Sequence, residues 1–184
     1  MKIYELIIIS LSLSMDAFSV SICKGLQFNK HIKKYAFILA LSFSLFQMLM
    51  PLLGYFLGNS LNTYFLKFNK LIAFFLLFII GFNMIKESFE KENTSNTLTF
   101  KELMVLSIAT SIDAFSIGLT FSLFKVNLLL AISLIGIITF VVCFIGVLIG
   151  KYFGKKLDKL SEILGGIILI IMSLKFLLEH FNIF

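Results

Sequence analysis

Six long apolar segments dominate the sequence and limit what the chain can fold into. About 20 apolar residues in a helix span the ~30 Å hydrocarbon layer of a bilayer. Runs of this length without polar alternation exclude barrel strands, so each segment is predicted to be a transmembrane helix. The segments lie approximately at 3–23, 35–57, 69–88, 103–124, 126–150 and 161–181.

The composition agrees with a membrane protein and excludes several other classes. Hydrophobic residues make up 59% of the chain and charged residues 14%, whereas soluble domains carry about 25% charged residues. The net charge of +6 comes from lysines alone, and the absence of arginine argues against a nucleic-acid partner. The sequence has no G-x-x-x-x-G-K-[ST] motif for nucleotide binding and no group of residues typical of the active site of a soluble enzyme. We therefore expect no enzyme activity, no nucleotide and no cofactor, with the lipid bilayer as a partner.

A short motif with an aspartate occurs twice, each time inside an apolar segment. SMDAFS at 14–19 places Asp16 in the first segment, and SIDAFS at 111–116 places Asp113 in the fourth, 97 residues later. A charged residue at membrane depth costs about 2.5–3.5 kcal/mol on insertion scales, so it indicates a functional site. The two aspartates are therefore the first candidates for such a site.

The rest of the two halves also corresponds. Gly54 and Gly58 precede Gly146 and Gly150 by 92 residues. The predicted organisation is a three-helix repeat at 1–90, a cytoplasmic linker loop at 91–102 and a second three-helix repeat at 103–184. Because three is odd, the halves would cross the membrane in opposite senses, as inverted repeats do. The predicted fold class is an all-α, polytopic membrane protein with six transmembrane helices.

The positions of the two aspartates predict that they lie at similar depth. Asp16 lies about 20 Å from one surface and Asp113 about 15 Å from the other, at ~1.5 Å per helical residue. Both depths are close to the middle of the ~30 Å core. The two carboxylates could therefore face each other across the interface between the halves.

Lysine distribution predicts the orientation of the helices. Eleven of the sixteen lysines lie on one side of the predicted membrane, and the other five include Lys175. The lysine-rich side is expected to face the cytoplasm, which places both termini outside. Lys24 and Lys125 follow the two aspartate motifs and are expected to extend to the membrane interface.

The chemistry around the aspartates favours a hard divalent cation. Two carboxylates in a low-dielectric site repel each other, and a divalent ion removes that conflict. Carboxylate, hydroxyl and amide oxygens suit Mg²⁺, Ca²⁺ and Mn²⁺. Helix locking by the aspartates and a proton relay remain alternatives. The predicted ligands are Asp16 and Asp113, with Ser12, Ser19, Gln47, Thr110 and Ser116 as weaker candidates.

The motifs at 14–25, 50–58, 111–121 and 161–170 resemble the MntP family of manganese efflux pumps along essentially the whole chain. The resemblance implies a six-helix inner-membrane protein that exports Mn²⁺ and protects against manganese toxicity. The family's intramembrane acidic positions correspond to Asp16 and Asp113. At the position of Gln47 some relatives carry glutamate, and glutamine still offers a carbonyl oxygen there.

Two other functions remain open on the sequence alone. Sporulation membrane proteins share the aspartate motif, and a non-transporting assembly factor of that kind would use the aspartates to hold helices together. An exporter of another divalent cation or of a small organic solute is the other alternative. For an Mn²⁺ exporter, we expect secondary transport by alternating access, with proton antiport as one possible coupling.

Overall fold

The fold is all-α, as predicted. The computed structural model describes residues 3–27, 32–57, 64–89, 98–123, 126–157 and 160–180. Within these residues every element is a helix, because the long apolar segments satisfy their backbone hydrogen bonds internally. The seven helices are α1 (Ile3–Gln27), α2 (Ile32–Leu57), α3 (Tyr64–Phe89), α4 (Phe100–Ala109), α5 (Ile112–Leu123), α6 (Leu128–Leu157) and α7 (Leu160–His180).

Three of these helices are long and apolar enough to cross a membrane. They comprise Ile3–Gln27, Ile32–Leu57 and Leu128–Phe153, and the bent pair α4–α5 makes a fourth candidate if it counts as one span. In the described part of α3 and α7, the apolar stretches are shorter, at Phe74–Asn83 and Gly166–Lys175. The chain is therefore a multi-pass membrane protein with three to four candidate spans by length and composition.

The fourth apolar segment differs from the prediction of one continuous helix. It is divided at Thr110 and Ser111 into α4 and α5, which meet at an angle of 42°. α4 also begins at Phe100, earlier than expected, and residues 91–97 of the predicted linker lie outside the described part. The break has a local cause in the two hydroxyl side chains, which is described with the site below.

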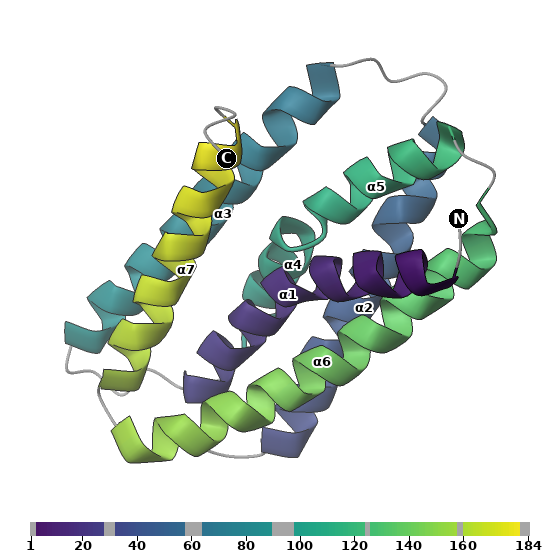
Figure 1. Cartoon of the computed structure of the whole chain (residues 1–184). Helices are drawn as coiled ribbons and strands as arrows, with labels where there is room; N and C mark the ends of the chain where they lie inside the picture. The colour runs from purple at the N-terminus through teal and green to yellow at the C-terminus, as the bar shows by residue number, and fades with distance from the viewer. Residues whose placement is uncertain are drawn as a thin grey trace.

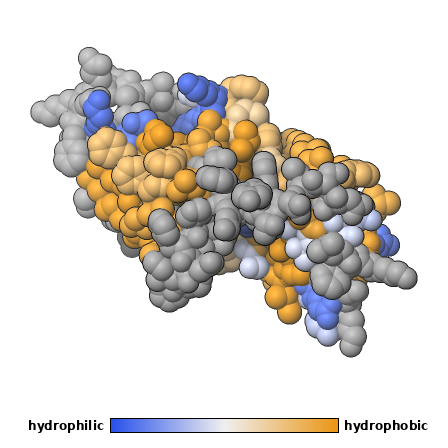
Figure 2. Space-filling model, turned by 90° about the horizontal axis from the view of Figure 1, so that it is seen from above, coloured by the Kyte–Doolittle hydropathy of each residue, from blue (hydrophilic) through white to orange (hydrophobic). Residues whose placement is uncertain are grey.

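The surface carries many large apolar side chains, as a lipid-facing protein requires. Figure 2 shows apolar residues over much of the face seen from above, with hydrophilic residues gathered toward two ends of it. Exposed examples include Ile8 on α1, Leu53 on α2, Phe82 on α3 and Ile137 on α6. On a water-soluble monomer such patches would be exceptional in extent, whereas in a bilayer they contact acyl chains.

The helices pack as a central group with a two-helix pair beside it. α1 packs along α6, α2 packs along both α5 and α6, and α3 packs along α7 (Figure 1). The α3–α7 pair contacts the central group through α7 against α1 and through α3 against α4 and α5. The two aspartate helices, α1 and α4–α5, therefore each have a neighbour from this pair.

Glycines bring the helix backbones together in the central group. A Cβ atom on Gly54 of α2 would meet the Phe115 carbonyl oxygen of α5 at 2.2 Å. A Cβ on Gly150 of α6 would meet the Ile22 carbonyl oxygen of α1 at the same distance. Small residues allow this close approach of helices in membranes. The aspartate helices are thus held by direct backbone packing against α2 and α6.

We expect Gly150→Ala to lower stability by about 3 kcal/mol, because overpacking against an immovable group costs roughly 1–3 kcal/mol or more. The added methyl group would collide with the backbone of α1 at Ile22. Gly136→Ala is the matched control on the same helix. Its methyl group would meet the Met48 sulfur at 2.3 Å, at the end of a flexible side chain that can move aside. Thermal unfolding in detergent measures both, and an equal loss at both positions would contradict this packing account.

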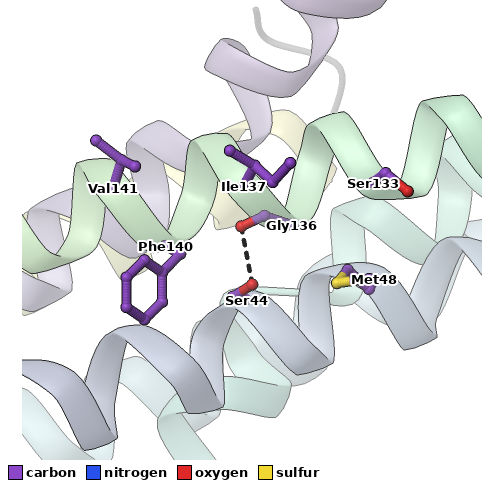
Figure 3. A pocket seen from close by; sticks show the side chains of 7 residues that line it. All are labelled: Ser44, Met48, Ser133, Gly136, Ile137, Phe140 and Val141. Carbon is purple, nitrogen blue, oxygen red and sulfur yellow. Dashed lines mark hydrogen bonds between the residues drawn. The ribbon is translucent and has the colours of Figure 1, made fainter.

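A hollow of about 340 Å³ lies between α2 and α6. Figure 3 shows Ser44 of α2 facing Gly136 of α6, and the Ser44 hydroxyl donates to the Gly136 carbonyl at 2.8 Å. The lining is mostly apolar and includes the exposed Ile137 and Val141. None of the predicted metal ligands lines this hollow, and its surface suits acyl chains better than a hydrated ion.

Candidate metal site between the two aspartate helices

Asp16 lies in the middle of α1 and is almost fully buried. The residue is 8% exposed, and its Oδ1 atom accepts a hydrogen bond from the Lys175 Nζ atom of α7 at 3.0 Å. The Asp16 side chain is 11% exposed and that of Lys175 53%. A buried carboxylate is costly unless it is paired. The Lys175 ammonium group therefore provides the partner that the buried Asp16 carboxylate needs, while the Lys175 side chain itself stays about half exposed.

Asp113 lies in the first turn of α5, directly after the break. Its Oδ1 atom accepts a hydrogen bond from the Ala114 N–H at 2.8 Å. The positive end of the α5 dipole favours a carboxylate at this position. The Asp113 carboxyl also interacts electrostatically with Asp16 and with Lys175. The fold thus brings the two aspartates of the repeated motif into one electrostatic neighbourhood.

The break before Asp113 follows from side chains that compete with the helical backbone. The Thr110 hydroxyl donates to the Leu106 carbonyl at 2.9 Å, and the Ser111 hydroxyl donates to the Ser107 carbonyl at 2.6 Å. Such back-bonding of Ser and Thr in helices bends them. The Ser111 N–H turns to the Ile108 carbonyl at 3.1 Å, so the last turn of α4 tightens. Helix ends at membrane depth are typical of ion sites in transporters.

Gln47 connects the two aspartate helices. Its Nε2 atom donates to the Thr110 carbonyl at 2.8 Å and to the Leu13 carbonyl of α1 at 3.3 Å. The side chain is fully buried, and its Oε1 atom has no hydrogen-bond partner among the residues that the structure describes. Because both contacts need a donor, the amide nitrogen is fixed toward the two carbonyls. The buried carbonyl oxygen of Gln47 is therefore available to a ligand.

We expect Gln47→Leu to lower stability by about 2 kcal/mol, because a buried acceptor left without its donor costs roughly 1–3 kcal/mol. The Thr110 carbonyl at the break would lose its bond from α2. Thr139→Val is the control, since the buried Thr139 hydroxyl also has no hydrogen-bond partner in the described part of the chain. That substitution should be neutral or slightly stabilising. Unfolding in denaturing detergent compares the two, and a neutral Gln47→Leu would contradict the connecting role of Gln47.

The weaker predicted ligands differ from one another in their burial and in their hydrogen bonds. Ser12 is exposed on α1 and lies outside the buried part of the site. The Ser19 hydroxyl donates to the Met15 carbonyl at 2.9 Å within its own helix. Thr110 is buried at the break, and Ser116 is partly buried on α5. The structure therefore brings Gln47 and Thr110 together next to the aspartate motifs, and it does not bring Ser12 into that buried group.

Two charged contacts were missed in the sequence. The sequence assigns Lys175 only to the lysine-poor side of the membrane, whereas in the structure its Nζ atom contacts Asp16 Oδ1. Lys24 and Lys125 are expected from the sequence to extend to the membrane interface, but Lys24 is buried against other residues of the protein, and Lys125 lies outside the described residues. Lys24 is 2% exposed and forms an ion pair with Glu102 of α4, and it donates to Gln27 Oε1 at 2.8 Å. The acidic residue in the first turn of α4 was the available signal, but pairing it with Lys24 required the packing of α1 near α4.

The site offers oxygen ligands for a cation and few others. Among the described residues, no group of three or more His, Cys, Asp or Glu side chains could hold a metal ion. Any ion here would therefore depend on the two carboxylates, with amide or backbone oxygens and retained water for its remaining positions. Such a shell suits hard divalent ions rather than Zn²⁺ or Cu²⁺, which favour nitrogen and sulfur.

Comparison with known proteins gives the family. Residues 29–177 match the family model Mntp, described as "Putative manganese efflux pump". The chain belongs to the Mntp family. A protein named "Putative manganese efflux pump MntP" from Acetivibrio thermocellus is 47% identical over 186 residues, covering 100% of this chain and 94% of its own.

Further relatives agree with the family membership. A protein of the same name from Campylobacter jejuni is 49% identical and covers 98% of each chain, and one from Desulfitobacterium hafniense is 46% identical, covering 96% and 94%. No solved structure matches the chain. The resemblance predicted from the motifs is thus confirmed, and the Mntp family is one of transporters rather than enzymes.

Proposed function

We propose that this protein exports Mn²⁺ across the cytoplasmic membrane as a secondary transporter and thereby protects the cell from manganese toxicity. The observation that carries the proposal is the electrostatic interaction between Asp16 and Asp113, the two aspartates of the repeated motif. The two carboxylates would bind the ion. Gln47 Oε1, a buried oxygen without a hydrogen-bond partner in the described helices, would add a third oxygen ligand.

The manganese identity in this proposal rests on the family. Oxygen ligands alone select hard divalent ions as a class, and Mg²⁺, Ca²⁺ and Mn²⁺ all belong to it. The relatives named above are described as manganese efflux pumps. Mn²⁺ is therefore the substrate that combines the chemistry of the site with the names of the relatives.

The proposed architecture is six membrane spans in two inverted three-helix halves. Contacts that recur at the sequence offsets support it. Gly54 packs against Phe115 and Gly118, and at the corresponding positions Gly146 packs against Phe18 and Ser21. The two glycines are 92 residues apart in the sequence, and the residues that they contact on the two aspartate helices are 97 residues apart.

The contacts between corresponding positions support a two-fold relation more directly. The Ser44 hydroxyl bonds to Gly136, which lies 92 residues later. Gln47 bonds to both Leu13 and Thr110, which are 97 residues apart. A residue contacts its own counterpart only near a symmetry axis. The proposed axis therefore passes close to Ser44 and Gln47, between the two aspartate helices.

Alternating access of the two halves would expose the site to each side in turn. Discontinuous helices at such sites let helix ends face the ion, and the break between α4 and α5 provides one here. The lysine distribution predicts that both termini lie outside, and Lys30, Lys91 and Lys159 of the lysine-rich side lie outside the described residues. The domain limits at 90 and 103 follow from the same arrangement.

Mn²⁺ transport into inverted membrane vesicles tests the proposal. Vesicles with the protein should accumulate radioactive Mn²⁺ above the level of vesicles that lack it. Stimulation of uptake by a pH gradient that is acidic inside the vesicles would identify protons as the coupling ion. Labelled amino acids in place of Mn²⁺ test the organic-solute alternative. Uptake equal to that of empty vesicles, with the protein present and folded, would contradict export.

One contact favours a second candidate function. Asp16 is bonded to Lys175 of another helix, and such a bond would also serve a membrane assembly or sporulation factor that uses its aspartates to hold helices together. The two functions differ in one outcome. In a helix-locking protein, Mn²⁺ tolerance of sensitive cells would not depend on Asp16 or Asp113.

A further inference from the structure

Asp16 has an intramolecular cation at the place where the proposed substrate would bind. The Lys175 ammonium lies 3.0 Å from Asp16 Oδ1. Its side chain is 53% exposed, while that of Asp16 is 11% exposed. A lysine head group on a flexible four-carbon chain can turn from a buried partner to a more polar environment. The bond is therefore positioned so that a stronger cation could replace it.

The two halves differ in this feature. The residue that corresponds to Lys175 by the offset of 92 is Asn83 on α3, which carries no charge. Asp113 has the Ala114 N–H as a bonding partner within its own helix. Among the described residues, Asp16 and Asp113 therefore share the positive charge of one ammonium group, that of Lys175.

We propose that Lys175 is the counter-cation of the ion-free site, which binds Asp16 when Mn²⁺ is absent and is displaced when Mn²⁺ enters. This inference rests on the proposed export function and adds a residue to it. A divalent ion and an ammonium group compete for the same carboxylate oxygen, and the ion prevails because it also binds Asp113. When the ion leaves, Lys175 returns to Asp16.

The counter-cation affects two steps in opposite directions. It weakens Mn²⁺ binding, because the ion must displace it. It also eases the return of the empty carrier, because closing off an ion-free site from water costs less when an ammonium group offsets part of its negative charge. Removing the ammonium should therefore tighten binding and slow the cycle, a combination that damage to the fold would not produce.

The first experiment measures equilibrium Mn²⁺ binding to the purified full-length protein. Lys175→Asn introduces the residue of the other half and should bind Mn²⁺ about tenfold more tightly. Lys175→Arg retains a cation and should bind close to the wild-type affinity. Asn83→Ala is the control at the corresponding position and should leave the affinity unchanged. Unchanged affinity in Lys175→Asn would overturn the inference.

The second experiment separates the return step from ion translocation in proteoliposomes. Exchange of Mn²⁺ across the membrane with the ion on both sides does not require the empty carrier to return, whereas net efflux does. Lys175→Asn should retain exchange and lose about tenfold in net efflux. Equal loss of both activities would indicate a structural role and overturn the inference. Absence of both in the wild-type protein would instead overturn the export function on which it rests.

Discussion

Asp113→Asn is expected to reduce Mn²⁺ efflux at least about a hundredfold while the protein keeps its fold. Even groups that only support a metal ligand are worth about 10–100-fold in affinity or activity, and Asp113 is a proposed ligand itself. Asparagine has the same size and can still accept the bond from the Ala114 N–H. The substitution therefore removes the charge with little change in shape, and one carboxylate cannot neutralise a divalent ion.

Growth of manganese-sensitive cells in high Mn²⁺ measures this effect. Asp16→Asn should behave in the same way, and Ser122→Ala is the control on the Asp113 helix. The Ser122 hydroxyl donates to the Leu119 carbonyl at 2.7 Å within that helix and has no part in the proposed site. Full tolerance with both aspartate variants, at normal protein levels, would favour the helix-locking function.

Glu102→Met is expected to lower the free energy of unfolding by about 3 kcal/mol. Breaking a buried ion pair by removing one partner costs roughly 3–5 kcal/mol, because the other charge stays buried without compensation. The Lys24 side chain is 3% exposed and would keep only the Gln27 amide oxygen as a described partner. Denaturant titration in detergent measures the loss.

The double variant shows whether the pair or the individual side chains matter. Lys24→Met combined with Glu102→Met should recover most of the lost stability, since an apolar pair can replace a buried ion pair at little cost. Lys24→Met alone should cost less than Glu102→Met, because the Glu102 side chain is 28% exposed and can interact with water. Equal and additive losses would show that the two charges do not interact.

Much of the fold could be predicted because hydropathy is a property of single segments. The helices at 3–27, 32–57 and 128–157 correspond to apolar segments in the sequence. The break at Thr110 could not be predicted, because the first half carries the same aspartate motif in the unbroken α1. The break depends on back-bonding of Thr110 and Ser111 together with the bond from Gln47, a contact between distant segments.

The residues of the candidate site that belong to the repeated motif could be predicted from the sequence. Those that depend on contacts between distant helices could not. The repeated motif identified Asp16 and Asp113, and the depth estimate suggested that they could meet. Lys175 looked like an ordinary lysine near the end of a helix, and only the contact of α7 with α1 places it on Asp16. Ser12 shares a helical face with Asp16 in sequence spacing, but it is exposed. The spacing of residues along a helix predicts which of them share a face of that helix, whereas the burial of each residue depends on how the neighbouring helices pack against it.

Mn²⁺ binding to the purified protein, followed by the electron paramagnetic resonance of the free ion, tests the central proposal most directly. If both carboxylates hold one ion, the wild-type chain should bind one Mn²⁺, and Asp16→Asn or Asp113→Asn alone should abolish that binding in the same concentration range. Two ions per chain, or wild-type affinity in either single variant, would contradict a shared site.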